Sequence, residues 1–158
     1  MGLNLEYQYR VQDLNARYTE AIDEDRLESW PDFFRPDGKY LINTAENVAQ
    51  NLPLGLMFAT SQAMLRDRIK ALRQANVYEA QRYRHVLGAP VILGDANGIV
   101  TARTSFVAAR IMHSGETMLF ATGVYEDRIA LDGDSTLFAE KKVIIDSRQI
   151  DTLLAIPL

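Results

Sequence analysis

Two histidines, His85 and His113, are the residues of this chain best suited to metal chemistry. A mononuclear non-haem iron site needs two histidines and a carboxylate that converge on one ion. If the segments on either side of Ala96 form a hairpin, His85 lies opposite Val107 and His113 lies roughly 20 Å away, at about 3.3 Å per residue. We therefore expect no metal site built from both histidines.

Acid–base chemistry by Asp23 and His85 is the alternative that these residue types allow. A histidine paired with a carboxylate can take a proton from a bound substrate or return one. His85, however, begins a predicted strand beside Arg82 and Arg84, where a hydrogen-bonded structural histidine is the simpler interpretation. His113 adjoins a predicted turn, and we expect it to be exposed.

The composition excludes several other kinds of site. The chain has no cysteine, so a thiolate nucleophile, a disulfide framework and a zinc or iron–sulfur cluster held by this chain alone are excluded. No Ser-His-Asp spacing and no phosphate-binding glycine pattern is present. We expect no catalytic, cofactor-binding or metal-binding residue and no cofactor in this chain.

The charge pattern shows no basic segment of the kind that binds nucleic acid or an anionic membrane. The net charge is −4, with 17 basic and 21 acidic residues, and both signs are mixed along the chain. The basic run at residues 82–85 is short, and salt bridges to a neighbouring surface explain it better. The aromatic residues Trp30, Phe33 and Phe34 are typical of a core.

The first half of the sequence predicts helices. Apolar residues spaced by three or four predict a helix from Asn4, its N-cap, to the acidic residues 23–25. A short amphipathic segment follows at 27–34 with Pro31 in its first turn, then a turn at 36–38, a strand at 39–43 and an irregular stretch at 44–59. A second helix is predicted over 61–75, followed by a polar link at 76–83. The stripes of the two long helices are Tyr7, Val11, Leu14, Tyr18 and Ile22, and Met64, Leu65, Ile69 and Leu72.

The second half predicts long antiparallel strands. Runs rich in β-branched and aromatic residues cover 84–93, 99–113, 116–130 and 136–146, and turns at 94–98, 114–115 and 132–134 divide them. Helices followed by a meander indicate the α+β class, with the helices packed on one face of a curved sheet. The length of 158 residues fits a single domain over 1–158.

Both faces of these strands are apolar. One face would carry Phe106, Met118 and Phe120, and the other Val107, Leu119 and Tyr125. A sheet with one solvated face should alternate more cleanly. Either the sheet curls around its own concave face, or its outer face packs on another subunit, and the two are compatible. The sequence does not say which face points outward.

The amino-terminal residues and the hydropathy favour a protein of the cytoplasm. The first six residues lack the basic and apolar regions of a signal peptide. No apolar run approaches the ~18 residues that a membrane span needs.

Motifs distributed over nearly the whole chain carry a family resemblance. They are Trp30-Pro31-Asp32-Phe33-Phe34, residues 64–69, Arg84-His85-Val86-Leu87-Gly88, Ser105-Phe106 with Arg110, residues 123–127 and Ile156-Pro157-Leu158. In this order and spacing the sequence resembles the small (beta) subunits of Rieske-type aromatic-ring-hydroxylating dioxygenases. Within that family it is most similar to subunits serving aromatic carboxylates such as terephthalate, benzoate or salicylate.

The resemblance implies a fold and a role. The fold is a nuclear-transport-factor-2-like (NTF2-like) cone. The role is a non-catalytic small subunit, three copies of which pair with three large (alpha) subunits. The large subunits carry the Rieske [2Fe-2S] cluster and the mononuclear iron, and they use dioxygen and electrons from a reductase to hydroxylate an aromatic ring. Self-association, as a trimer within this three-plus-three hexamer, follows as an expectation.

Two other functions fit the same fold. One is a small isomerase or dehydratase that resembles ketosteroid isomerase or scytalone dehydratase and uses Asp23 and His85. The other is a dimeric module that binds small apolar ligands. Fold alone does not distinguish them from a small subunit.

Overall fold

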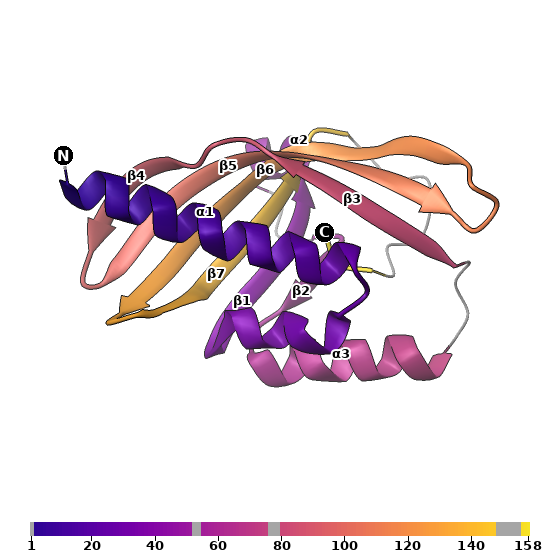
Figure 1. Ribbon diagram of the computed structural model, residues 1–158, viewed down its shortest axis with the longest axis horizontal. Coiled ribbons are helices and arrows are strands. Elements are labelled where there is room, and N and C mark those ends of the chain that lie inside the picture. The colour runs from indigo at the N-terminus through magenta and orange to yellow at the C-terminus, as the bar shows by residue number, and fades with distance from the viewer. Residues whose placement is uncertain (1, 52–54, 76–79, 148–155) are drawn as a thin grey trace.

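The computed structural model describes residues 2–51, 55–75, 80–147 and 156–158, with the side chains of residues 2–4 left out. Figure 1 shows a long helix crossing in front of a strongly twisted sheet. The helices are α1 (Gly2–Asp23), the 3-10 helix η1 (Leu27–Phe33), α2 (Ala45–Ala49) and α3 (Gln62–Ala75). The strands are β1 (Phe34–Thr44), β2 (Met57–Ala59), β3 (Gln81–Leu87), β4 (Val91–Ala96), β5 (Ile99–Met112), β6 (Thr117–Asp132) and β7 (Ser135–Ile145).

The strands form one curved sheet in the order β2-β1-β7-β6-β5-β3, and β4 pairs with the part of β5 that β3 leaves free. Every pairing is antiparallel except that of β1 with β7, which is parallel. The predicted α+β class, with helices packed on a curved and mainly antiparallel sheet, is confirmed.

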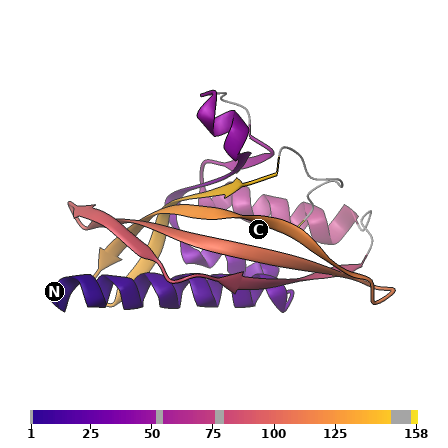
Figure 2. The same cartoon turned by 90° about the horizontal axis from the view of Figure 1, so that it is seen from above.

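The core lies between the inner face of the sheet and the helices α1, η1 and α3. The predicted stripe of α1 is confirmed, because Val11, Leu14, Tyr18 and Ile22 are buried and Tyr7 is half-buried. These residues pack on the inner sheet positions together with Trp30 of η1 and the buried side of α3. Figure 2 shows α1 along one side of the sheet and α2 standing on the opposite side.

Several helix predictions were wrong in detail. The helix α1 begins at Gly2, so Asn4 lies within it and does not cap it. Pro31 lies inside η1 rather than in its first turn. In α3 the buried residues are Leu65, Ile69 and Leu72, whereas Met64 is 39% exposed. The backbone N and the hydroxyl of Thr60 donate to the Met64 sulfur at the start of the helix, which holds that side chain at the surface.

The first strand and the segment after it also differ from the prediction. The strand predicted over 39–43 is longer, because residues 36–38 form an irregularity within β1 instead of a separate turn. The stretch 44–59 is not wholly irregular. It contains α2, capped by Thr44 Oγ1, which accepts from Asn47 N at 3.1 Å, and the short strand β2.

The predicted strand 84–93 is two strands. Pro90, which has no N–H to give to a ladder, lies in the break between β3 and β4. This break and a bulge in β4 place His85 opposite Ala108 rather than Val107. The strand β3 begins at Gln81, so the predicted polar link was wrong at 81–83, and residues 76–79 of that link lie outside the described residues.

The three predicted turns between the later strands are confirmed by their backbone angles. Asn97 and Gly98 have φ of 54° and 77°, Gly115 has 91° and Gly133 has 56°. Such positive values favour glycine and tolerate asparagine.

A bulge in β6 decides which side chains reach the core. Ala108 pairs with Ala121, but the next residue of β5 pairs with Leu119, so Phe120 is the extra residue. Phe120 consequently turns inward and stacks on Tyr83, with ring centroids 5.3 Å apart.

The predicted grouping of the strand residues was therefore partly wrong. The inner face holds Phe106 together with Tyr125, whose rings stack at 4.6 Å, and also Phe120. Met118 is half-buried, and its sulfur accepts from Arg110 on the same side. Val107 and Leu119 are on the outer face, 41% and 64% exposed.

Among the described residues, no helix is both long and apolar enough to cross a bilayer.

Candidate functional site

The predicted pair of Asp23 and His85 forms and is buried. Asp23 is the last residue of α1, and His85 points inward from β3. Asp23 Oδ1 lies 2.6 Å from His85 Nδ1, and Asp23 Oδ2 accepts from the backbone N of His85 at 2.8 Å. One carboxylate therefore fixes both the backbone and the ring of His85, which ties the end of α1 to the edge of the sheet.

The accessibility of His85 does not suit proton transfer to a substrate. A pocket of about 310 Å³ lies between α1 and β3, and Asn15, Thr19, Asp23, His85 and Thr104 contribute to its lining. The imidazole is nevertheless 0% exposed: Asp23 occupies Nδ1, and Nε2 is buried with no hydrogen-bond partner among the described residues. A general base must come within hydrogen-bond reach of the proton that it takes. Nδ1 is taken by Asp23 and Nε2 is inaccessible to solvent, so this geometry supports the structural interpretation.

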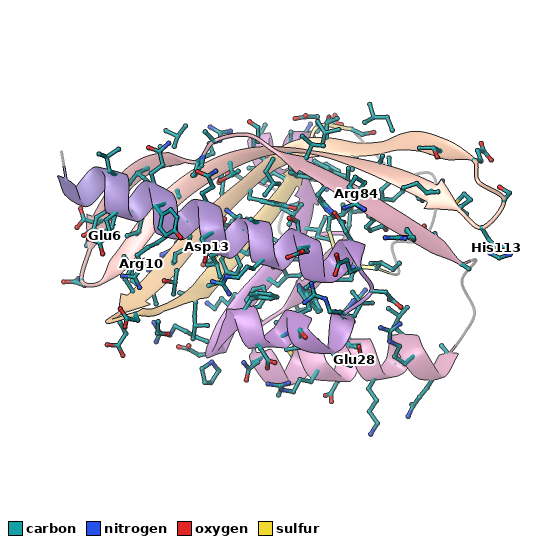
Figure 3. The ribbon with its side chains drawn as sticks, in the orientation of Figure 1. Glu6, Arg10, Asp13, Glu28, Arg84 and His113 are labelled. Atoms are coloured by element: carbon teal, nitrogen blue, oxygen red, sulfur yellow. The ribbon has the colours of Figure 1, made fainter. Side chains whose placement is uncertain are left out.

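The two histidines do not converge. His113 lies five positions beyond Ala108, the partner of His85, which is about 17 Å along β5 at about 3.3 Å per residue. Figure 3 places His113 at the far end of the molecule beside the β5–β6 turn, and it is exposed. Within the described ranges, no three or more His, Cys, Asp or Glu residues lie close enough to hold a metal ion.

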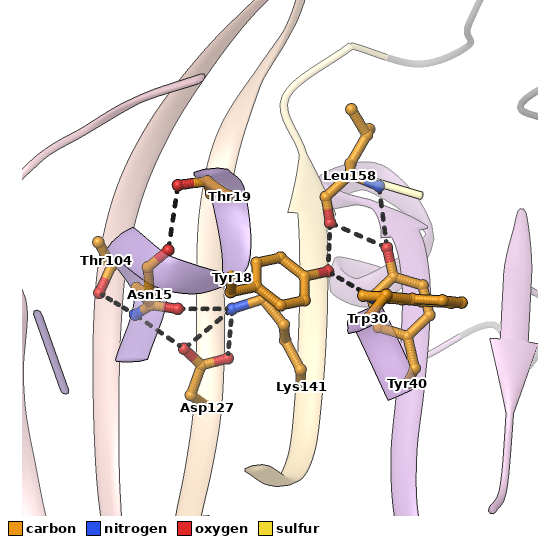
Figure 4. A network of polar contacts seen from close by, with 9 residues as sticks. All are labelled: Asn15, Tyr18, Thr19, Trp30, Tyr40, Thr104, Asp127, Lys141 and Leu158. Carbon is orange, nitrogen blue, oxygen red and sulfur yellow. Dashed lines mark hydrogen bonds and ion pairs between the residues drawn. The ribbon is translucent and has the colours of Figure 1, made fainter. Parts of the chain in front are cut away.

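The most strongly polar feature of the interior is a buried lysine, which the sequence analysis missed. Lys141 of β7 is fully buried, and its Nζ donates to Asn15 Oδ1 at 2.9 Å and to both oxygens of Asp127 at 3.2 Å (Figure 4). Asn15 Nδ2 in turn donates to Asp127 Oδ2 at 3.3 Å and to Thr104 Oγ1 at 3.4 Å. This network links α1 to three neighbouring strands.

Aromatic rings surround the same ammonium group. Lys141 Nζ lies 3.6, 4.3 and 4.6 Å from the ring centroids of Tyr125, Phe138 and Tyr18. Burial lowers the pKa of Lys141 to about 8, although Asp127 opposes the shift. Burial raises the pKa of the Asp127 carboxyl, and Lys141 and Asn15 counteract that rise. A paired lysine enclosed on all sides cannot meet a substrate, so we assign the network a structural role.

The alternation of inward and outward side chains along β6 and β7 could have revealed the pair of Asp127 and Lys141 from the sequence. Asp127 follows Tyr125 and precedes Ile129 on the inner side of β6, and Lys141 precedes Val143 on the inner side of β7. Charges of opposite sign at core positions of two adjacent strands indicate a buried ion pair.

A second buried polar network joins Tyr18, Trp30 and Tyr40 to Leu158. Tyr18 and Tyr40 hydroxyls donate to the carbonyl of Leu158 at 2.7 and 2.9 Å, and Trp30 Nε1 donates to Tyr18 Oη at 3.3 Å (Figure 4). Ile156 and Leu158 are buried beside these rings. The interpretation of Trp30 and Phe34 as core residues is confirmed, and Phe33 is half-buried against the core.

The basic run at residues 82–85 is divided by the strand alternation. Tyr83 and His85 are buried, whereas Arg82 and Arg84 are exposed. Figure 3 shows Arg84 on β3 close to α1. The four residues therefore do not form one basic patch.

Comparison with protein families identifies one family model. The model described as "Ring hydroxylating beta subunit" matches residues 17–152, which is most of the chain.

Relatives of known name agree with this match. The chain is 44% identical over 150 residues to the terminal oxygenase component subunit beta 1 of terephthalate 1,2-dioxygenase from Comamonas sp, covering 94% of this chain and 97% of the relative. It is 35% identical over 150 residues to the anthranilate 1,2-dioxygenase small subunit of Burkholderia cepacia, covering 95% and 93%.

A solved structure extends the similarity to the fold. A crystal structure from Novosphingobium aromaticivorans, assigned as the beta subunit of an aromatic-ring-hydroxylating dioxygenase, superimposes with a TM-score of 0.91. The two chains are 37% identical, and the match covers 99% of each.

Proposed function

The chain belongs to the family of ring hydroxylating beta subunits, and from this premise we propose that it is the small subunit of a dioxygenase that hydroxylates an aromatic carboxylate. The observation that carries the proposal is the 44% identity to a terephthalate dioxygenase beta subunit over nearly the full length of both chains. The relative whose substrate is anthranilate, another aromatic carboxylate, favours the same substrate class.

We infer that catalysis resides in the large subunit and that this chain supplies structural support. The Rieske cluster and the mononuclear iron would be held by the large subunit, because the residues of this chain do not fit either group. A Rieske cluster takes two cysteines and two histidines, and this chain has no cysteine. Its two histidines are separated along the sheet, and one is enclosed with Asp23.

The assembly is part of the proposal. One NTF2-like domain over residues 1–158 would pair with one large subunit, and three such pairs would form a hexamer in the cytoplasm. The small subunits would also contact one another within it.

The alternative of an isomerase or dehydratase using Asp23 and His85 is not favoured. The relatives are dioxygenase small subunits, and both ring nitrogens of His85 are enclosed.

Co-expression tests the proposal. The chain is produced with an affinity tag, either alone or with the large subunit of a terephthalate dioxygenase, and a matched culture carries an unrelated cone-fold protein instead. We expect the large subunit to co-purify in equal amount with this chain and to hydroxylate terephthalate when a reductase supplies electrons. Failure of this large subunit and of an anthranilate dioxygenase large subunit to bind the chain would contradict the proposal.

A further inference from the structure

The turn between β4 and β5 places an asparagine directly before a glycine. Asn97 and Gly98 join Ala96 to its cross-strand partner Ile99. Their φ values of 54° and 77° are the positive angles that a two-residue hairpin turn of this kind requires. Asn97 is also the only asparagine of the sequence that a glycine follows. The residues that form the turn are therefore a pair in which a backbone nitrogen can reach a side-chain amide.

The atoms that would react are accessible. Asn97 and Gly98 are both exposed. Within the part of the chain that the structure describes, no hydrogen bond occupies the Asn97 side-chain amide or the Gly98 N–H. The carbonyl of Gly98 accepts from Leu131 N at 2.9 Å, which ties the turn to β6 but leaves the Gly98 nitrogen unoccupied. Glycine has no Cβ to hinder the approach of that nitrogen, and its backbone rotates more freely than that of other residues.

The chemistry that this pair allows is the loss of ammonia from the asparagine. A bond forms between the Gly98 nitrogen and Asn97 Cγ, and the proton of that nitrogen passes to a base in the solvent. The bond from Cγ to Nδ2 breaks, and ammonia leaves with a proton from water. Water then opens the cyclic imide at either of its carbonyl carbons and leaves an aspartate or an isoaspartate. The sum consumes one water and releases one ammonia, so no oxidant, reductant or cofactor is needed.

We propose that Asn97 is a site of spontaneous deamidation in the folded chain, with Gly98 as the internal nucleophile. The inference goes beyond the proposed function, because it depends only on this turn and holds whether or not a large subunit binds. Each conversion adds one negative charge to a chain whose net charge is −4.

Two other asparagines serve as internal comparisons. Asn51 is exposed and has a φ of 53°, almost the same as Asn97, but the residue after it is a leucine. Asn15 is buried, and its amide donates to Asp127 and Thr104. A difference between Asn97 and Asn51 therefore reports the effect of the following residue, and a difference from Asn15 reports the effect of exposure.

An isoaspartate at position 97 would alter the edge of the sheet. It carries one extra backbone carbon, and the length of a hairpin loop sets the register of the strands that it joins. Among the described strands β4 pairs with β5 alone, so no second strand holds it in register. The new carboxylate would also lie two residues from Asp95, which accepts from the Tyr7 hydroxyl of α1 at 3.2 Å. We expect β4 to loosen from β5 and from α1 once isoaspartate forms.

Incubation of the folded full-length chain in warm, mildly alkaline buffer tests the proposal. Cleavage after Arg84 and Arg103 yields a peptide in which Asn97 is the only asparagine. Mass spectrometry follows the gain of about 1 Da per conversion, and an isoaspartyl methyltransferase with a labelled methyl donor counts the isoaspartate. We expect this peptide to convert before those that contain Asn15 or Asn51. Amide hydrogen exchange in β4 should rise with the converted fraction.

Two variants serve as controls. Asn97→Gly removes the side-chain amide and keeps a residue that accepts positive φ, so the turn should form while the signal of this peptide is lost. Gly98→Ala keeps the amide but sets a methyl group beside the attacking nitrogen, so conversion should slow. Because a φ of 77° strains an alanine, circular dichroism checks its folding, and Asn97→Gly carries the test if Gly98→Ala does not fold.

A sample unfolded in urea shows whether the fold protects the amide. Conversion of Asn97 in urea but not in the folded chain would overturn the inference. Earlier conversion at Asn51, or an unchanged rate in folded Gly98→Ala, would overturn it as well, because the glycine would then have no part in the reaction. None of these outcomes bears on binding of the large subunit, so the proposed function is tested separately.

Discussion

Lys141 shows how single residues decide the stability of this interior. A fully buried ammonium loses its hydration, which costs several kcal/mol. Here Asp127, Asn15 and three aromatic rings replace the lost water. Because the replacement groups come from α1, β6 and β7, the lysine keeps these elements in one arrangement.

Removal of only one member of this pair should be costly. We expect Lys141→Met to lower the free energy of unfolding by roughly 3–5 kcal/mol, because it leaves Asp127 buried without its cation. The double variant Lys141→Met/Asp127→Leu should recover most of this loss. Urea unfolding of both variants measures the difference, and a double variant no more stable than Lys141→Met would contradict the view that the unpaired Asp127 carboxylate causes the loss.

Tyr125 offers a contrasting test on an unpaired hydroxyl. Its ring is fully buried, but Tyr125 Oη has no hydrogen-bond partner among the described residues. An unsatisfied buried polar group costs about 1–3 kcal/mol. We therefore expect Tyr125→Phe to unfold at the same urea concentration as the wild type or a higher one. The control Tyr40→Phe, which removes the hydrogen bond to Leu158, should unfold earlier.

His85 tests the absence of acid–base catalysis in this chain. The loss of a general acid or base slows turnover by about 10²–10⁴-fold. For His85→Ala we expect turnover within about tenfold of the wild type, after activity is divided by the amount of assembled complex from size exclusion. A thousandfold loss in a fully assembled complex would favour the isomerase or dehydratase interpretation.

At the scale of elements, irregularities in the strands set the shape of the sheet. The bulge at Phe120 turns one side chain of β6 inward, and the break at Pro90 gives β5 two short partners instead of one long strand. A bulge increases the local twist of its strand, and a twisted sheet can wrap around α1.

Gly123 of β6 lies directly against the backbone of β7. A Cβ built there would lie 2.0 Å from Ile144 O and 2.9 Å from Ile145 Cα, both backbone atoms of β7. Gly123→Ala should therefore force β6 and β7 apart and lower the free energy of unfolding by about 1–3 kcal/mol or more. Gly94→Ala is the control, because no atom lies within 4 Å of its Cβ position. Equal melting temperatures for the two variants would contradict the argument.

At the scale of the whole molecule, the small subunit is a filled cone. Helices and two polar networks occupy the inner face, and Val86, Val107 and Leu119 are exposed on the outer face. This division agrees with a subunit that contributes surface and rigidity to a complex.

Metal content tests this view of the molecule. We expect the purified chain to contain no stoichiometric iron or zinc after dialysis against a chelator, and to show no visible absorption. The reason is the lack of cysteine and the separation of the two histidines. Elemental analysis that finds one retained iron per chain would contradict this expectation. The complex reconstituted with the large subunit is the positive control for iron detection.

The sequence by itself determined the class of the fold and most of its elements. The periodicity of Val11, Leu14 and Tyr18 predicted the face that α1 buries. The glycine-containing runs at 94–98 and 132–134 predicted two of the turns, in which Gly98 and Gly133 adopt positive φ. These features depend on local spacing and local backbone angles, which a sequence carries directly. The missing cysteines likewise excluded a cluster without reference to any structure.

Only the tertiary structure decided which strands pair and to which face of the sheet each side chain points. The parallel contact of β1 with β7 joins segments about a hundred residues apart, and no local pattern encodes it. One inserted residue at Phe120 reverses the face of every residue beyond it, so Tyr125 and Leu119 could not be separated by alternation alone. The enclosure of His85 by Asp23 and the pairing of Lys141 with Asp127 depend on how a helix lies across three strands, which is fixed by packing over the whole molecule.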